Sequence, residues 1–199
     1  DIIEGCMIEK PAIHVYDMAL GDYEYLLHKL RIVTYGNTYK MSIQCPNCGE
    51  VVDVKSNLEE LMIKELDLAK FNSLKTVNLP KSNKVVSLNF TTPRMLEQAA
   101  FMAKDMKRRF KEADFDFDLM TKLKLGITSV DGQVLNDFEL ETFINNLPAL
   151  DMRKIVNAIK DLNDSFGVDN TLIVTCPKCG EDVTTFFRIG PDFFGPEDI

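Results

Sequence analysis

The sequence has few of the residues and motifs on which most enzymes depend. It contains only two histidines, and it has no glycine-rich phosphate loop, no G-x-S-x-G motif and no H-E-x-x-H motif. His28 lies within an expected helix, where a structural role is favoured, and His14 lies in a segment without a clear pattern. The sequence therefore predicts a protein that is not an enzyme.

Positive charge is also scarce. The chain has 23 Lys and Arg against 31 Asp and Glu, which gives a net charge of −8. Proteins that bind nucleic acid through its phosphates rely on Lys and Arg to displace counterions. The one basic run, residues 104–111, would spread its charges around a helix and favours a solvated face. The composition therefore disfavours nucleic-acid binding as the main activity.

Long hydrophobic runs are missing as well. No apolar run approaches the ~20 residues that span a bilayer, so we expect no membrane span. Hydrophobic residues make up 45% and charged residues 27% of the chain, which is the balance of a folded globular protein. The 199 residues are expected to form a single domain.

Four of the five cysteines lie in two copies of Cys-Pro-x-Cys-Gly, at residues 45–49 and 176–180, which we call the first and second knuckle. Each knuckle interrupts a β-rich run, 38–55 or 171–189, and this pattern predicts a hairpin with the knuckle at its tip. The proline pre-sets φ at the turn, and the glycine can adopt the positive φ that frees backbone N–H groups to point at sulfur. The two hairpins are predicted to be the halves of a zinc ribbon.

Two thiolates from each knuckle supply the four ligands of tetrahedral zinc. A site with four thiolates and no open position is structural rather than catalytic. Closing a loop of roughly 130 residues costs about 4 kcal/mol plus a constant, whereas structural zinc contributes roughly 10–16 kcal/mol in apparent terms. We therefore expect one structural zinc ion bound by Cys45, Cys48, Cys176 and Cys179.

Four alternatives stay open for the knuckles. They could be metal-free turns, or the four thiolates could be shared between two chains. They could be redox-active, although such motifs usually begin a helix. They could also hold iron in a rubredoxin-like centre. Zinc is preferred over iron because nothing in the sequence indicates an electron-transfer partner. The unpaired Cys6 fits a reducing compartment better than a disulfide framework.

The remaining pattern predicts an α+β fold that is mostly helical. A largely helical insertion, residues 56–170, separates the two knuckle hairpins and contains a central β-hairpin within 74–90. Residues 126–133 are expected to be a loop with an Asp-Gly turn. Asp151 is expected to cap the last helix. Helices are predicted at 18–35, 92–111, 116–125, 137–146 and 151–166.

The C-terminal segment is rich in phenylalanine and proline. Its two interpretations are a tail, residues 190–199, that packs on its own domain, and a peptide that docks into a partner protein. The candidate partner-binding residues are Phe186, Phe187, Phe193 and Phe194.

Several stretches resemble baseplate hub assembly proteins of contractile-tailed, T-even-like bacteriophages. These are "GDYEYLLHKLRIVTYGNTYKMSIQCPNCGE", "LPKSNKVVSLNFTTPRMLEQ", "LPALDMRKIVNAIKD" and "FFRIGPDFF", and the likeness runs through most of residues 17–195. The ending "FFGPEDI" departs from the basic or serine-containing ending expected for this family, which leaves the partner of the tail in doubt.

The resemblance implies a non-enzymatic phage tail protein, either a hub component or a hub assembly chaperone. Its partners would be other tail and baseplate proteins, including the tape-measure protein or the central hub protein. It would be located in the baseplate of the virion, in the host cytoplasm during assembly, or in both. The alternative function is a nucleic-acid-binding zinc-ribbon regulator, which the net charge disfavours.

Overall fold

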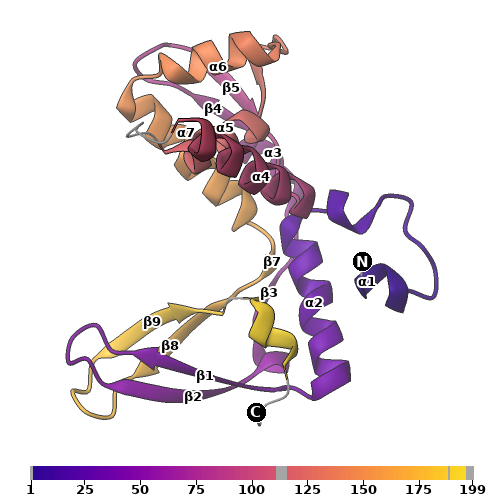
Figure 1. Ribbon diagram of the computed structural model, residues 1–199, viewed down its shortest axis with the longest axis vertical. Helices are drawn as coiled ribbons and strands as arrows, with labels where there is room; N and C mark the ends of the chain where they lie inside the picture. Colours follow the sequence, from indigo (N-terminus) through magenta and orange to yellow (C-terminus); the bar gives the residue numbers. More distant parts are fainter. Residues whose placement is uncertain (1, 111–115, 188, 196–199) are drawn as a thin grey trace. The chain divides into compact units, whose positions relative to one another are not determined.

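The computed structural model describes residues 2–110, 116–187 and 189–195, and the chain forms two compact units (Figure 1). Unit 1 comprises Asp1–Lys10, Glu24–Lys64 and Gly167–Ile199, and unit 2 comprises Pro11–Tyr23 and Glu65–Phe166. The chain therefore passes between the units four times. Each unit has hydrophobic clusters of its own.

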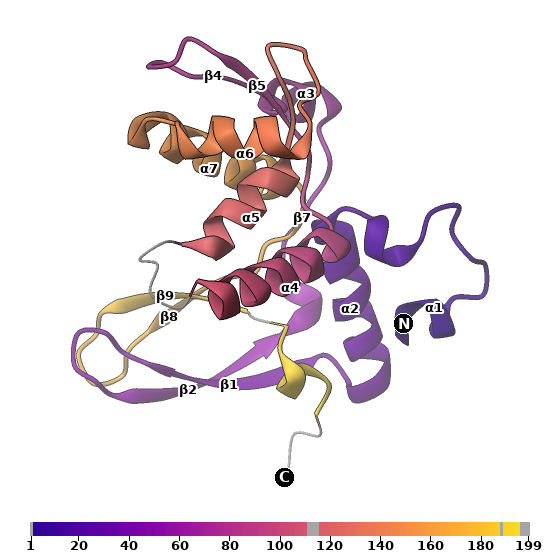
Figure 2. The ribbon, with the colours of Figure 1, turned by 45° about the horizontal axis from the view of Figure 1, so that its top comes forward.

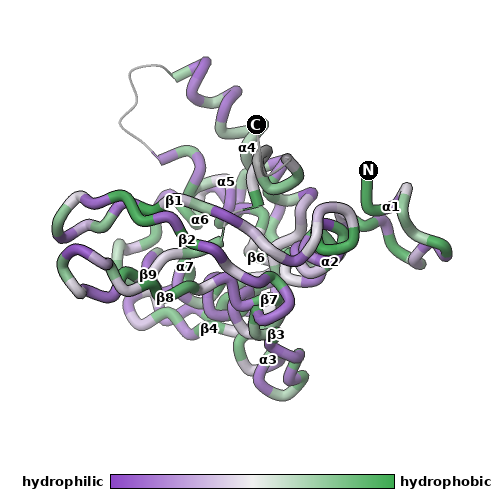
Figure 3. The backbone as a smooth tube through the Cα atoms, turned by 90° about the horizontal axis from the view of Figure 1, so that it is seen from below, coloured by the Kyte–Doolittle hydropathy of each residue, from purple (hydrophilic) through white to green (hydrophobic). Residues whose placement is uncertain are grey.

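Two antiparallel hairpins form the sheet part of unit 1. Strands β1 (Thr38–Gln44) and β2 (Val51–Asn57) enclose the first knuckle, and β8 (Thr171–Thr175) and β9 (Asp182–Phe186) enclose the second. Exposed residues alternate with buried or half-buried ones along most of β2 and along β8, as expected for strands with one packed face. Figure 3 shows hydrophobic and hydrophilic residues mixed along these strands. The inner faces contribute Ile43, Val52 and Val183 to a cluster that also contains two of the knuckle cysteines, Cys45 and Cys176.

A second cluster in unit 1 is closed by the C-terminal segment. The 3₁₀ helix η3 (Pro191–Phe194) places the fully buried Phe193 next to Tyr39 of β1 and His28, with ring centroids 5.4 and 5.2 Å away. Phe187 is also buried in this cluster. The other buried member of this cluster is Leu58 of the 3₁₀ helix η2 (Leu58–Glu60).

The remaining elements of unit 1 are α1 (Ile2–Cys6), most of α2 (Leu20–Tyr35), β3 (Ile63–Lys64) and β7 (Gly167–Val168).

The side chain of His28 has a structural role in this cluster. It is almost fully buried, and burial is the main influence that lowers its pKa. Its Nδ1 lies 2.8 Å from the carbonyl oxygen of Glu24. Since a carbonyl oxygen only accepts hydrogen bonds, Nδ1 must carry the hydrogen.

Unit 2 is built around a three-stranded antiparallel sheet in the order β4-β5-β6. The sheet and the helices α6 and α7 contribute buried residues to the core of this unit, among them Val86, Ile144, Ile155 and Leu162. Figure 2 shows these helices beside β4 and β5. The elements are η1 (Val15–Asp17), α3 (Leu68–Leu74), β4 (Thr76–Asn78), β5 (Val85–Leu88), α4 (Pro93–Arg109), α5 (Phe117–Gly126), β6 (Ile127–Val130), α6 (Asp137–Asn145) and α7 (Ala149–Asn163).

Several helix boundaries follow the signals in the sequence. The side chain of Thr92 accepts a hydrogen bond from the N–H of Met95, and Pro93 is the first residue of α4. Gly36, with φ of 87°, follows the last residue of α2. The α+β class is confirmed by the mixture of helices with small antiparallel sheets. Within the described residues, no helix combines the length and apolarity of a membrane span.

Two local predictions were wrong. Residues 127–130 were expected in a loop but form β6, which pairs with β5. Only the first and last of these four residues are apolar, so the sequence lacks the alternation that indicates a strand. Asp151 does not cap α7, which begins two residues earlier. Instead, its fully buried carboxylate accepts hydrogen bonds from the backbone N–H groups of Lys81 (3.0 Å) and Ser82 (2.8 Å), in the turn between β4 and β5.

We predict that Phe193→Ala lowers the free energy of unfolding of unit 1 by about 3 kcal/mol. This value is at the lower end of the range for replacing a buried phenylalanine with alanine, because the terminal segment can detach locally. Phe186→Ala is the matched control, because Phe186 is 58% exposed, and it should cost less than about 1 kcal/mol. Native-state hydrogen exchange of the β1 and β2 amides measures unit 1 separately. Equal losses in the two variants would show that η3 contributes nothing to this core.

Candidate metal centre

The two knuckles have the same backbone geometry. In the first, the N–H of Cys45 donates to the carbonyl of Glu50 (2.8 Å), and the N–H of Gly49 donates to the carbonyl of Cys45 (2.9 Å). The equivalent residues of the second knuckle form the same two hydrogen bonds at the same distances. Gly49 and Gly180 adopt φ of 73° and 75°, a conformation that other residues rarely adopt. Each turn therefore presents its two cysteines on the same side.

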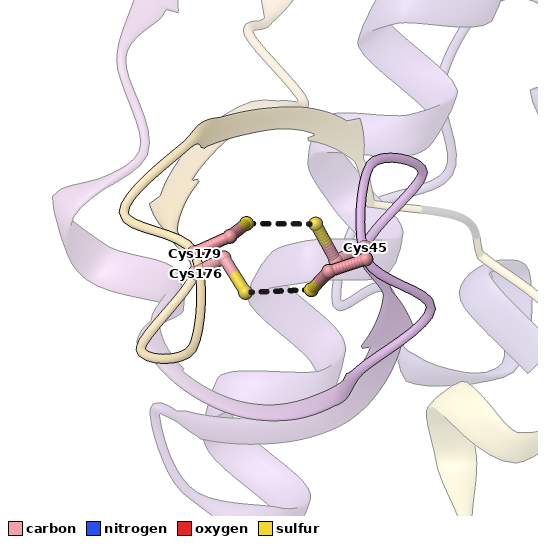
Figure 4. Close-up of side chains that lie close together, drawn as sticks. Cys45, Cys176 and Cys179 are labelled. Carbon is pink, nitrogen blue, oxygen red and sulfur yellow. Dashed lines mark hydrogen bonds between the residues drawn. The ribbon is translucent and has the colours of Figure 1, made fainter.

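The four sulfur atoms converge on one point. Sγ of Cys45 lies 3.7 Å from Sγ of Cys179, and Sγ of Cys48 lies 3.7 Å from Sγ of Cys176, and all four lie within 4.8 Å of one another. Figure 4 shows the sulfurs of the two turns pointing toward each other. Tetrahedral zinc with Zn–S bonds of about 2.3 Å would place its sulfurs about 3.8 Å apart. The observed spacing therefore fits a tetrahedral four-thiolate metal site.

Burial divides the ligands into two kinds. Cys45 and Cys176, the first cysteine of each knuckle, are 1% exposed and belong to the hydrophobic cluster between the hairpins. Cys48 is half-buried and Cys179 is exposed. An ion bound here would rest against the end of the hydrophobic cluster, and its outer side would face solvent.

The thiols of the site influence one another's ionisation. The backbone N–H of Glu50 acts on the Cys48 sulfur and on its own lowers the pKa of the thiol. Desolvation and the three neighbouring thiols outweigh it and raise the pKa of Cys48 to about 12. Four adjacent thiols resist ionisation because their negative charges would repel one another. A divalent metal ion would reverse this balance, since thiolates are its ligands.

A salt bridge joins the knuckles independently of the cysteines. Nζ of Lys178, the third residue of the second knuckle, lies 2.8 Å from a carboxylate oxygen of Glu50. The hydrogen bond with Glu50 raises the pKa of Lys178, and the nearby Cys48 and Cys176 contribute in the same direction. This pair was not predicted, although the sequence carries a signal for it: Lys178 is the only residue by which the second six-residue motif differs from the first, which has Asn47. Both side chains are largely solvated, so the bridge is a minor contribution.

The predicted partner-binding phenylalanines are placed differently from one another. Phe186 projects from β9 and is exposed, whereas Phe187 and Phe193 are buried in unit 1, and Phe194 is half-buried. Their role in binding a partner stays a prediction. Cys6 is exposed and is not part of the four-cysteine group.

Comparisons with known proteins place the chain in a viral context. A family model described as "T4 bacteriophage base plate protein" matches residues 1–195, which is nearly the whole chain. Searches of curated proteins and of solved structures gave no match.

We predict that Cys48→Ser and Cys179→Ser each abolish stoichiometric metal binding and destabilise unit 1 to a similar extent, because an ion at this point would use ligands from both knuckles. Metal content per chain, measured by inductively coupled plasma mass spectrometry after gel filtration, checks this.

Two control variants separate ligand loss from other effects. Cys6→Ser should keep the full metal content, and Lys178→Met should keep it with less than about a tenfold change in affinity, because an exposed ion pair is screened by solvent. Full metal in one of the two ligand variants and none in the other would rule out a shared site.

Proposed function

The chain belongs to the T4 bacteriophage base plate protein family, and we propose that it is a non-enzymatic structural protein of the phage tail that acts through protein–protein contacts. The family match over residues 1–195 is the observation that carries this proposal. Membership in the family implies a location in the tail of the virion and contacts with other tail and baseplate proteins.

We propose that the chain belongs to the hub of the baseplate, where it is a hub component or a chaperone of hub assembly. The resemblance of several stretches of the chain to hub assembly proteins supports this assignment. The partners would be the central hub protein or the tape-measure protein. Exposed apolar side chains such as Phe186 in unit 1 and Phe138 in unit 2 supply surface for such contacts.

We propose that the metal is a structural zinc ion and that the two hairpins form a zinc-ribbon module. Four thiolates at tetrahedral spacing leave no position for a substrate, which is the arrangement of structural zinc sites. Iron in the same ligand set is the alternative. The ion would join residues 38–57 to residues 171–186, so that segments distant in the sequence become one folded unit.

The location is tested by quantitative mass spectrometry of purified virions beside lysate from infected cells. A hub component is expected in both, at a fixed ratio to a known baseplate protein. An assembly chaperone is expected in the lysate and in baseplate intermediates but not in virions. A phage replication protein serves as the negative control. Absence of the chain from virions and from all baseplate intermediates would contradict the proposed function.

The identity of the metal is tested on protein purified from cells grown without added metal. We predict a colourless protein with one zinc ion per chain. A rubredoxin-like iron centre would instead give a red protein that absorbs visible light, and that result would replace zinc with iron.

A further inference from the structure

We propose that oxidation converts the metal centre into disulfide bonds between the two knuckles, Cys45 with Cys179 and Cys48 with Cys176. The two segments that the ion joins would then remain joined after the ion has left. The inference rests on the metal centre proposed above and adds a redox response to that site.

Two pairs of sulfur atoms lie close together across the knuckles. Each of these two pairs has its Sγ atoms 3.7 Å apart, and each pair takes one cysteine from each knuckle. A disulfide bond is about 2.05 Å long, so each pair must approach by less than about 2 Å. Side-chain rotation and a small movement of the turns provide that approach without unfolding either hairpin.

Contacts that do not involve the metal also hold the knuckles together. Ile43 and Val52 of the first hairpin share a hydrophobic cluster with Val183 of the second. The ion pair between Lys178 and Glu50 joins the tips themselves. When the metal leaves, these contacts keep each thiol beside its counterpart in the other knuckle. Bonding within a knuckle is the competing outcome, because all four sulfurs lie within 4.8 Å of one another.

The two cysteines of each pair differ in their accessibility to solvent. Cys179 is exposed and its counterpart Cys45 is 1% exposed, and the half-buried Cys48 likewise faces the buried Cys176. Oxidants react first with accessible thiolates, and a neighbouring thiolate then resolves the product. Each pair therefore consists of one thiolate that an oxidant can reach and one protected thiolate in position to resolve it.

The reaction balances with hydrogen peroxide as the oxidant. The Cys179 thiolate attacks one peroxide oxygen, the O–O bond breaks, and sulfenic acid and hydroxide form. The Cys45 thiolate then attacks the sulfur of Cys179, the S–O bond breaks, and a second hydroxide leaves. Two thiolates lose two electrons in total, and one peroxide becomes two waters after protonation. A second peroxide oxidises Cys48 and Cys176 in the same way, and the metal leaves because its ligands are consumed.

This conversion suits a particle that is built in a reducing cell interior and then released from it. The pairs close loops between residues 134 and 128 positions apart in the sequence. Cross-links that close long loops restrict the unfolded chain most, in the chain-entropy account of disulfide stabilisation. The disulfide bonds of the oxidised protein would therefore keep the two hairpins of unit 1 joined after the particle has left the cell, where the zinc–thiolate bonds are no longer maintained.

The test uses the full-length protein carrying Cys6→Ser, which prevents disulfides between chains, and begins with its zinc content. Peroxide is added in steps, released zinc is followed with a colorimetric chelator, and free thiols are alkylated. Non-reducing peptide mapping by mass spectrometry then identifies the disulfides. We expect zinc release to parallel the loss of four thiols, with peptides of residues 45 and 179 and of residues 48 and 176 cross-linked, and dithiothreitol with zinc should restore the starting state.

Disulfides within a knuckle, irreversible sulfinic or sulfonic acids in place of disulfides, or zinc-loaded protein that resists oxidation would each overturn the inference. Cys179→Ser should abolish the first cross-link and keep the second, whereas Cys48→Ser should do the reverse. The initial zinc content tests the proposed metal centre separately. Cross-knuckle disulfides in a protein that never held zinc would support the pairing and refute the zinc assignment.

Discussion

Unit 1 depends on the convergence of four sulfur atoms on one point. The hydrophobic cluster between its two hairpins is small, with Ile43, Val52 and Val183 as its buried aliphatic members. Two-stranded hairpins are marginally stable in water on their own. A metal ion bound by the four thiolates would add stabilisation and would remove the repulsion that opposes ionisation of the thiols, which the raised pKa of Cys48 reflects. It would fix in place two hairpins that the hydrophobic cluster and the ion pair between Lys178 and Glu50 already bring together.

The position of the cysteines in the chain gives this site its structural importance. The first knuckle precedes residues 65–166 and the second follows them, and those residues form most of unit 2 with a larger core of their own. Each unit can therefore be stabilised by a different means, unit 2 by hydrophobic packing and unit 1 by the metal and the η3 segment. For a protein of a baseplate family, two separately stabilised units would provide fixed surfaces for contacts with other tail proteins.

The parts of the fold that the sequence predicted are those with strong local signals. The repeated Cys-Pro-x-Cys-Gly motif, the Thr92-Pro93 start of α4 and the glycine after α2 each impose their own geometry. The strand β6 was not predicted, because its pairing with β5 depends on a distant part of the chain. Asp151 was assigned to a helix cap because local patterns cannot show that a carboxylate is needed by a turn 70 residues away. The burial of Phe193 is likewise a tertiary property, and the sequence left its two interpretations open.

X-ray absorption spectroscopy at the zinc edge of the purified protein decides whether the two knuckles share one ion, because it counts the atoms bound to the metal and identifies their element. A shared site predicts four sulfur neighbours at about 2.3 Å and no nitrogen or oxygen in the first coordination sphere. A coordination sphere with two sulfurs completed by nitrogen or oxygen would contradict it, since each knuckle would then bind metal without the other.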